Sequence, residues 1–394
     1  LHLSVARALA MVEGTFGIAV MSAREPGRIV CARRGSPLLL GLGNGRIFAA
    51  SDAAALLPYT RRVVYLDDGE LAVLDSSGAD ILSIDAMSRI AKPVEELDWD
   101  LESAEKGGHA HFMLKEIHEQ PSSLAATLRG RIQRSAPLVK LGGLSEVASV
   151  LGEANRIVFT ACGTSWHAGL IGKFMVEENA RIQADVEYAS EWRYRNPVLE
   201  PGTVVVGISQ SGETADTLAA LSLAKEKGAT TLGIVNVVGS SVARATDAGI
   251  YLHAGPEIGV ASTKAFTSQV AALSLFSLYL GRQRGLAPEV ADRVLRELQT
   301  LPEKVRKILD RAGEIEAMAR RLVDLGHSNY LYLGRGYSFP VSLEGALKLK
   351  EISYVHAEGF SAAEMKHGPI ALIDQDMPVV VVDESDRTLS LIHI

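Results

Sequence analysis

The sequence predicts an α/β protein with two copies of one parallel-sheet domain, the second incomplete, after a smaller region of β-hairpins and one helix. Two observations predict this class. From residue 156 onward, short apolar runs alternate with helical stretches of about 12 to 20 residues, which is typical of a parallel sheet covered by helices. The same order of segments then recurs, because Ser338 follows its strand as Ser165 follows an earlier one. The distance along the chain from Ser165 to Ser338 is called the repeat spacing below.

Composition limits the class of protein. The chain has 394 residues, enough for two or three domains at ~150 residues each, and 47% hydrophobic with 22% charged residues is typical of a packed globular protein. A net charge of −7 disfavours nucleic acid or an anionic membrane as the main partner. The densest apolar stretch, 270–280, is shorter than the ~18 residues of a spanning helix, so we expect no membrane segment.

The two cysteines, Cys31 and Cys162, suit a reducing compartment, and residues 1–11 lack the charge order of a secretion signal. We therefore expect a cytoplasmic protein. Cys31 lies in a β-prone run and is expected in the core. Cys162 begins a loop, where it could contact a ligand or fill a small buried capping position.

The N-terminal region is expected at 1–75. An amphipathic stretch at 5–12 predicts a helix, and β-prone runs at 29–32 and 63–66 predict strands of hairpins. Residues 76–145 are more charged and less periodic, and we expect a linker with one or two helices there. Four residues that break regular structure interrupt it: Pro93, Gly107, Gly108 and Pro121.

The first α/β domain is expected at 146–285, a helical segment at 286–320, and the second α/β domain at 321–394. In the first domain, strands are predicted at 156–161, 203–209, 231–235 and 249–252, and a helix at 215–227. In the second domain, a strand is predicted at 330–333 and a helix at 339–352. At the repeat spacing, Glu191 falls on Glu364, and the strand at 203 falls one position from a run at 377–380. A second copy that stops soon after this run would leave a sheet edge uncovered.

Hydroxyl groups follow two strands of the first domain. The loop after 203–209 contains Ser209, Gln210, Ser211 and Thr214, and a helix begins directly afterwards. Such a loop offers backbone N–H groups, hydroxyls and the positive end of a helix dipole to a phosphate. The alternative is ordinary capping of the helix, which needs only one hydroxyl. A second loop of this kind follows the neighbouring strand: Cys162, Gly163, Thr164 and Ser165.

Two other motifs are incomplete. The run from Gly207 to Ser211 has Ser where the nucleophile elbow of esterases needs its second Gly. The run beginning at Gly334 has Phe339 where a dinucleotide-binding fingerprint needs its third Gly. Neither an esterase nor a nicotinamide enzyme is indicated.

Candidate acid–base residues lie in the second domain. Glu344, Lys348 and Glu351 share one stripe of a helix, and His367 follows in the next segment. A carboxylate, a Lys and a His beside a phosphate loop would suit proton transfer next to a carbonyl. The alternative is a solvated Glu–Lys pair. The linker histidines, at positions 109, 111 and 118, lack a carboxylate or Cys pattern, so we expect no metal.

These motifs resemble the isomerising glutamine:fructose-6-phosphate aminotransferase family, also called glucosamine-6-phosphate synthase, over nearly the whole chain. The resemblance rests on the two hydroxyl loops, on 257–264, on 343–351 and on 364–369. It implies tandem SIS (sugar isomerase) domains, with parallel sheets flanked by helices and the second domain incomplete. Residues 34–37 and 50–52 resemble the C-terminal part of the family's glutaminase domain, an α+β N-terminal-nucleophile hydrolase fold.

The resemblance also implies a reaction. Ammonia from glutamine would aminate fructose 6-phosphate, which is isomerised to glucosamine 6-phosphate, with no cofactor and no metal. The phosphate would contact the two hydroxyl loops, and Val260 and Ser262 would line the sugar. Glu351 would move a proton between C1 and C2 beside Lys348, and His367 would assist ring opening from the neighbouring subunit of a homodimer.

Two departures from the family concern the ends of the chain. Position 1 is Leu, where the family's glutaminase has its nucleophilic Cys, and the tail that carries the family's Schiff-base Lys is missing. We therefore expect a fragment truncated at both ends, with residues 388–394 not native. The alternatives are an SIS-domain ketose/aldose isomerase or deglycase, which residues 1–75 disfavour, and a sugar-phosphate-sensing regulator, for which no DNA-reading module is visible.

Overall fold

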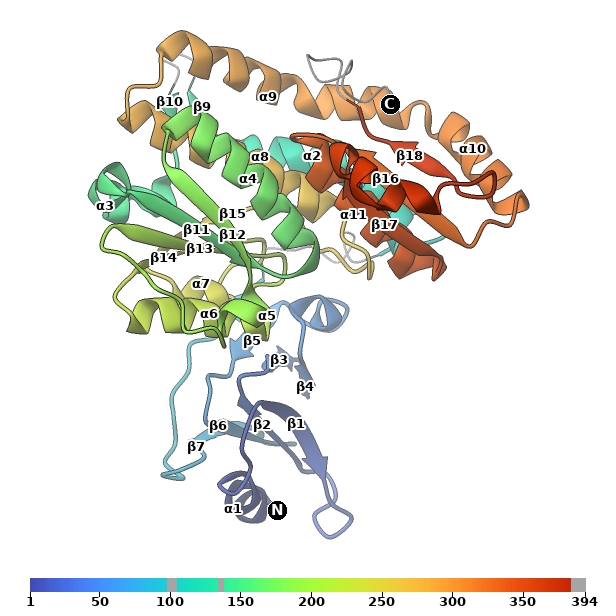
Figure 1. Ribbon diagram of the computed structural model, residues 1–394. Helices are drawn as coiled ribbons and strands as arrows, with labels where there is room; N and C mark the ends of the chain where they lie inside the picture. The colour runs from blue at the N-terminus through green and yellow to red at the C-terminus, as the bar shows by residue number, and fades with distance from the viewer. Residues whose placement is uncertain (98–104, 134–137, 384–394) are drawn as a thin grey trace.

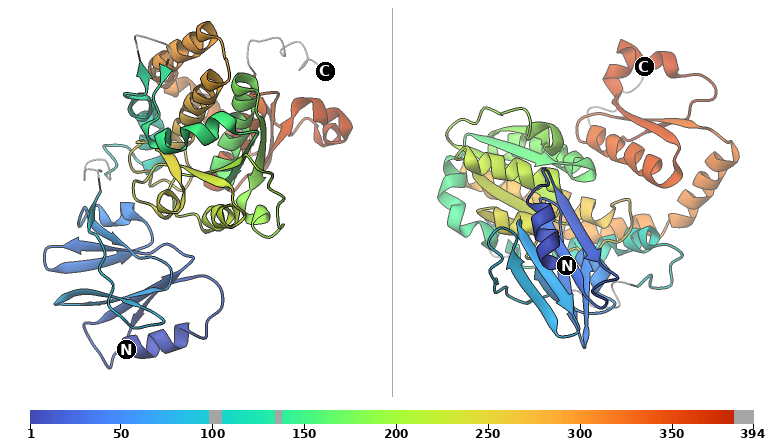
Figure 2. Two further views of the ribbon diagram at one scale, coloured as in Figure 1. Left: turned by 90° about the vertical axis from the view of Figure 1, so that its left-hand side faces the viewer. Right: turned by 90° about the horizontal axis from the view of Figure 1, so that it is seen from below.

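The computed structural model describes residues 1–97, 105–133 and 138–383. The N-terminal region lies at one end of the molecule, and the first α/β repeat lies between it and the long helix α9 (Figure 1). The second repeat packs against another side of the first repeat (Figure 2). The run at 388–394, expected to be non-native, lies outside the described residues. No helix within the described ranges is both long and apolar enough to cross a membrane.

The N-terminal region consists of two antiparallel sheets and a helix, α1 (His2–Leu9). One sheet has the order β1-β2-β6-β7: Phe16–Met21, Ile29–Arg34, Glu70–Asp75 and Gly78–Ser83. The other has the order β4-β3-β5-β8: Arg46–Ala50, Leu39–Gly43, Arg62–Tyr65 and Glu95–Glu96. The sheets face each other across one apolar cluster, and α1 covers the outer face of the first sheet.

The structure changes two expectations for this region. Strand β7 pairs with β6 and strand β8 pairs with β5, so the sheets extend past residue 75, where we expected a linker to begin. The predicted helix at 5–12 is present but spans His2–Leu9. The expectation for Cys31 is confirmed, because it is fully buried between the sheets. This burial raises the pKa of its thiol to about 11.

Helix α2 (Phe112–Leu128) continues through Pro121, which we expected to break regular structure. A proline lacks the N–H that would bond to the carbonyl four residues earlier, here that of Ile117. The side-chain amide of Gln120 donates to this carbonyl at 3.0 Å. The neighbouring side chain therefore satisfies the group that the proline leaves free.

The first repeat is a five-stranded parallel sheet in the order β12-β11-β13-β14-β15. Its strands are Gln183–Tyr188, Arg156–Ala161, Thr203–Ser209, Thr230–Val235 and Ala248–Tyr251. Its helices are α3 (Ala148–Glu153), α4 (Gly163–Ala180), α5 (Ala189–Trp192), α6 (Ala215–Glu226), α7 (Ser241–Ala245) and α8 (Lys264–Gln283). A short hairpin, β9 (Ile132–Gln133) with β10 (Leu138–Val139), and a 3-10 helix (Gly142–Val147) lead into it.

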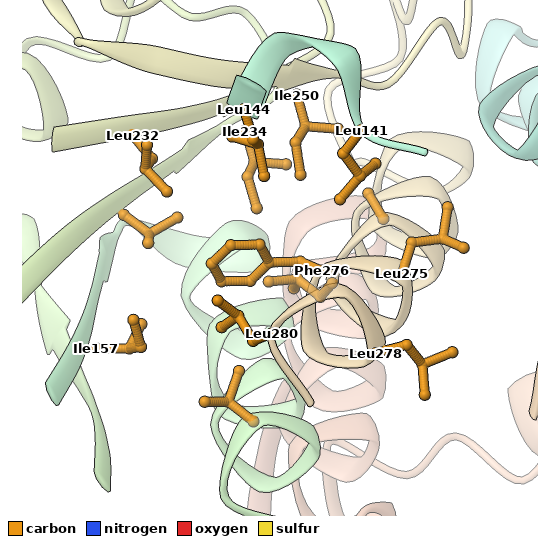
Figure 3. Packing of buried hydrophobic residues seen from close by; sticks show 14 of the residues in the cluster. Leu141, Leu144, Ile157, Leu232, Ile234, Ile250, Leu275, Phe276, Leu278 and Leu280 are labelled. Atoms are coloured by element: carbon orange, nitrogen blue, oxygen red, sulfur yellow. The ribbon is translucent and has the colours of Figure 1, made fainter. Parts of the chain in front are cut away.

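The core of this repeat lies between the sheet and helices α4 and α8. Figure 3 shows side chains of α8, among them Leu275, Phe276 and Leu280, facing Leu232, Ile234 and other apolar residues. Each apolar side chain of this size contributes ~1.5–3 kcal/mol when it is fully buried. This packing fixes the strand ends, where the predicted loops begin.

The second repeat follows α9 (Pro288–Leu309) and α10 (Ala312–Asp324). Its parallel sheet has the order β17-β16-β18: His356–Ser361, Asn329–Gly334 and Val379–Val381. Helix α11 (Ser338–Ser353) follows β16, and two 3-10 helices, Ala362–His367 and Pro369–Leu372, precede β18.

The predicted repeat is confirmed by strand register. Arg156 pairs with Gln183 in the first sheet, and Asn329 pairs with His356 in the second, so both strands recur at the repeat spacing. Val158 pairs with Val205, whereas Leu331 pairs with Val379. The third strand therefore departs from the repeat spacing by one position, as the sequence indicated.

Candidate active site

Both hydroxyl loops follow neighbouring strands at the same edge of the first sheet. Strands β11 and β13 pair in parallel, so their carboxyl ends lie side by side. The loop at Cys162 leads from β11 into α4, and the loop at 210–214 leads from β13 into α6. Ligands of open α/β sheets bind at this edge.

The second loop is bonded to itself. The hydroxyls of Ser209 and Thr214 lie 3.0 Å apart, and the Ser209 Oγ accepts from the backbone N–H of Gly212 at 3.0 Å. The Ser211 Oγ accepts from the N–H of Glu213 at 3.1 Å. Thr214 occupies the N-cap position of α6, yet its side chain makes no capping bond. The helix N-terminus therefore keeps donors that an anion can accept from.

Gly212 is required by the geometry of this loop. Its φ is +68°, and a Cβ built on it would lie 2.0 Å from the Ser240 Oγ.

We expect Gly212→Ala to lower the free energy of unfolding by more than the ~1–2 kcal/mol of left-handed backbone strain. Urea unfolding of the variant measures this change. Gly228→Ala is the matched control, because its φ is +83° and a Cβ would contact nothing within 4 Å. Equal losses in the two variants would show that the collision with Ser240 is relieved at no cost.

Glu213 ties the same loop to α7, which in turn contacts the N-terminal region. Its carboxylate accepts from the backbone N–H of Ser241 at 2.8 Å. Burial raises the pKa of Glu213, while the Ser241 hydrogen bond, Arg33 and Arg244 act in the opposite direction. Arg33, from β2, is 3% exposed and donates to the Ser241 hydroxyl at 3.3 Å.

The first loop faces the second repeat. The Ser165 hydroxyl accepts from Gln269 of α8 at 2.9 Å. Thr164 donates to the Glu344 carboxylate of α11 at 2.8 Å and accepts from the Lys348 ammonium at 3.0 Å. Cys162, at the N-cap of α4, is half-buried beside an apolar cluster, and burial raises the pKa of its thiol. Thr164 therefore joins the repeats at the predicted phosphate loop.

The predicted stripe on α11 is a cluster of charged groups. The Lys348 Nζ lies 2.6 Å from the Glu351 Oε2 and 3.3 Å from the Glu344 Oε1. Glu344 is 6% exposed and is therefore not a solvated surface charge, whereas Lys348 and Glu351 are partly exposed. The cluster brings a carboxylate and an ammonium next to the loop of the first repeat.

Other predicted site residues are not joined to this cluster. Ser262 donates to Glu257 at 2.8 Å, and Val260 is 90% exposed at the tip of the same segment. His367 is exposed at the end of its 3-10 helix, and no hydrogen bond or ion pair joins it to α11 within the described ranges. The remaining two lie in the loops: Gln210, whose carbonyl accepts from the Asn236 N–H, and Gly163, which has a φ of +54°.

Several polar residues that hold the site were not assigned to it from sequence. Glu257 accepts from Ser262 and from two backbone N–H groups, and Glu116 of α2 accepts from the N–H groups of Ile258 and Gly259. These two buried carboxylates fix both ends of the loop that carries Val260. His167 and Gln269 also contact site residues across long separations in sequence. Their partners become visible only when the chain is folded.

The described residues contain no group of three or more His, Cys, Asp and Glu side chains placed to hold a metal ion. Of the linker histidines, His109 and His118 stack their rings at a centroid distance of 5.1 Å.

Comparison with known proteins places this geometry in a family. The SIS domain family matches residues 151–279 and 327–394, together half of the chain. The chain is 56% identical over 389 residues to the isomerising glutamine–fructose-6-phosphate aminotransferase of Chlorobaculum tepidum, and it covers 63% of that protein. It is 50% identical over 381 residues to the enzyme of that name from Bacteroides thetaiotaomicron, with 62% covered. These two matches cover 99% and 96% of this chain, respectively.

A solved structure agrees. The C-terminal domain of glucosamine-fructose-6-phosphate aminotransferase from Francisella tularensis is 39% identical, with a TM-score of 0.69, over 73% of this chain and 80% of that one. The chain spans less than two thirds of the length of the two curated relatives above. The chain belongs to the SIS domain family, and over nearly its whole length it is similar to isomerising glutamine–fructose-6-phosphate aminotransferases.

Proposed function

We propose that this chain binds fructose 6-phosphate between its two repeats and contributes the isomerase site of an enzyme that makes glucosamine 6-phosphate and glutamate from fructose 6-phosphate and glutamine. One observation carries the proposal: Lys348 of the second repeat donates to Thr164 in the hydroxyl loop of the first. Acid–base groups and an anion-binding loop are therefore adjacent. The names of the curated relatives support the same reaction.

In this proposal the phosphate accepts hydrogen bonds from hydroxyls and backbone N–H groups of both loops: Ser165, Ser209, Gln210, Ser211 and Thr214. Charge-assisted bonds of this kind are roughly twice as strong as neutral ones. The phosphate then holds the sugar with C1 and C2 toward α11. Glu351 removes a proton from one carbon and returns it to the other, and Lys348 stabilises the oxygen that becomes negative.

The proposal includes a second copy of the chain. His367 is exposed on its own subunit and would reach the sugar held by the partner in a homodimer. Val260 and Ser262 would line the sugar in the closed complex. Both cysteines are unpaired, which supports a reducing cytoplasmic location.

Calorimetry with two sugars tests the proposal. We expect fructose 6-phosphate to bind this chain at least about 100-fold more tightly than fructose, because several charge-assisted bonds depend on the phosphate. Glucose 6-phosphate serves as a control for binding of any sugar phosphate. Equal affinities for fructose 6-phosphate and fructose, or the absence of binding by either, would contradict the proposal.

A further inference from the structure

Glu344 is a buried carboxylate that the two repeats share. It lies on α11, and its Oε1 accepts from Thr164 at 2.8 Å. Its Oε2 lies 2.6 Å from the Nδ1 of His167, which is on α4 of the first repeat and is 8% exposed. Within the described residues, His167 is the sole partner of this oxygen. Burial of a carboxylate is unfavourable unless its oxygens have partners, so loss of His167 leaves the buried Oε2 without a partner and weakens the hold on this position of Glu344.

The contact also fixes the hydrogen on the imidazole ring. Because Nδ1 lies against a carboxylate oxygen, Nδ1 carries a hydrogen and donates it. A side chain that replaces His167 can preserve the contact only if it has a donor at the same place. The amide nitrogen of Asn occupies nearly the position of Nδ1, whereas Leu fills similar space without a donor.

Glu344 in turn limits where Lys348 can lie. The Lys348 Nζ has three neighbouring acceptors, at 3.3 Å in Glu344, 3.0 Å in Thr164 and 2.6 Å in Glu351. A lysine side chain has four flexible carbons, so these acceptors decide the position of its ammonium group. If Glu344 turns away, Lys348 loses one of its three acceptors, and the Thr164 hydroxyl loses the carboxylate to which it donates. The ammonium is then free to move relative to Glu351.

We propose that His167 is a positioning residue for the isomerase site. It holds Glu344, and through Glu344 it holds Lys348 and Glu351 in line with the hydroxyl loops of the first repeat. The proposal rests on the proposed function in one respect, the assignment of Glu351 as the base. Within the described residues, the His167 side chain hydrogen-bonds to Glu344 and to no hydroxyl of the two loops, so its replacement leaves their donors in place.

A second contact between α4 and α11 provides a matched control. The Tyr337 hydroxyl donates to Glu178 at 2.8 Å, and the Tyr337 ring meets Phe174 edge-on at 5.6 Å. Glu178 lies 11 residues beyond His167 on α4, about 16 Å along the helix axis. Tyr337→Phe therefore removes a hydrogen bond between the repeats without touching the charged cluster.

The experiment compares the parent with His167→Leu, His167→Asn and Tyr337→Phe. Exchange of the C1 hydrogen of fructose 6-phosphate is followed by NMR in deuterated water, and affinity is measured by calorimetry. We expect His167→Leu to slow exchange by about 10–100-fold with affinity within about threefold, because small misplacement of a catalytic group reduces its rate strongly. His167→Asn and Tyr337→Phe are expected within about threefold of the parent in both measurements.

Three results would overturn the positioning role: a parent rate in His167→Leu, equal slowing in the Leu and Asn variants, or equal slowing in Tyr337→Phe. If the parent binds the sugar phosphate without exchanging hydrogen, the assignment of Glu351 fails instead.

Acylation of Lys348 by acetic anhydride then tests positioning without substrate. The labelled sites are mapped by mass spectrometry, and Lys173 serves as the reference lysine. Faster labelling of Lys348 in His167→Leu alone supports the role, and equal labelling in all variants overturns it. Should His167→Leu fail to fold, as circular dichroism would report, His167→Ala replaces it.

Discussion

Glu351→Gln is expected to slow exchange of the C1 hydrogen of fructose 6-phosphate by ~10²–10⁴-fold, the usual contribution of a positioned acid–base group. The amide keeps the size of the side chain and its hydrogen bonding, but it cannot accept a proton from carbon. The affinity for fructose 6-phosphate, measured by calorimetry, is expected to stay within a few-fold of the parent, because the proposed phosphate contacts all lie in the first repeat.

The rival interpretation treats Glu351 as a structural partner of Lys348, whose ammonium lies 2.6 Å away. Both side chains are partly exposed, and an ion pair of this kind contributes ~0–1 kcal/mol to stability. In that case the Gln variant exchanges hydrogen at the parent rate. Glu358→Gln is the control, because Glu358 is exposed on β17 and belongs to no part of the cluster. Parent-rate exchange in Glu351→Gln would remove α11 from the proposed chemistry.

The double variant Ser211→Ala, Thr214→Ala is expected to weaken binding of fructose 6-phosphate by ~10²–10⁴-fold. In the proposed function each lost hydroxyl donates to a doubly charged phosphate, and each such bond contributes ~1.5–3 kcal/mol. Binding of unphosphorylated fructose is expected to change little, so the ratio of the two affinities is the quantity to measure.

The two hydroxyls also bond within the loop, to the N–H of Glu213 and to the hydroxyl of Ser209. Their removal can therefore lower the stability of the loop as well as remove donors to the phosphate. Urea unfolding of the double variant separates the two effects. Ser222→Ala, on the exposed face of α6, controls for removal of a hydroxyl from this helix. Equal weakening for both sugars would show that Ser211 and Thr214 shape the loop without contacting phosphate.

The central strands were predictable, and so were the edge strands β15 and β18, whereas two other edge strands were not. β11 and β13 span the predicted residues because continuous apolar runs are typical of strands covered on both faces. The edge strands β12 and β17 were missed, since the sequences QADVEY and HAEGFS mix polar and small residues. An edge strand is partly exposed, so its sequence carries a weaker apolar signal. The repeat spacing, applied to β12, points to β17 once β12 is known.

The candidate site also has parts that the sequence predicts and parts that it does not. Its loops and the α11 stripe were predictable because each is contiguous or has helical spacing in the sequence. The contact of Glu344 with His167 joins residues 177 apart, and that of Gln269 with Ser165 joins residues 104 apart. Such pairs follow from the docking of α4 against α11 and α8, which depends on packing of many side chains. The amide of Gln120 that satisfies the Ile117 carbonyl in α2 is likewise not indicated by composition.

The buried guanidinium of Arg33 determines whether the N-terminal region can be exchanged as a module. This side chain donates to the Leu66 carbonyl of its own region at 2.9 Å and to the Ser241 hydroxyl of the first repeat at 3.3 Å. A chimera that takes residues 1–96 from a distant relative must supply an Arg at this position and an acceptor opposite it. If the Arg is missing, the junction contains an unfilled hole; if the Ser241 hydroxyl is missing, Arg33 keeps Asp68 and the Leu66 carbonyl but loses its acceptor in the first repeat. Libraries of such chimeras should therefore vary position 33 and position 241 together.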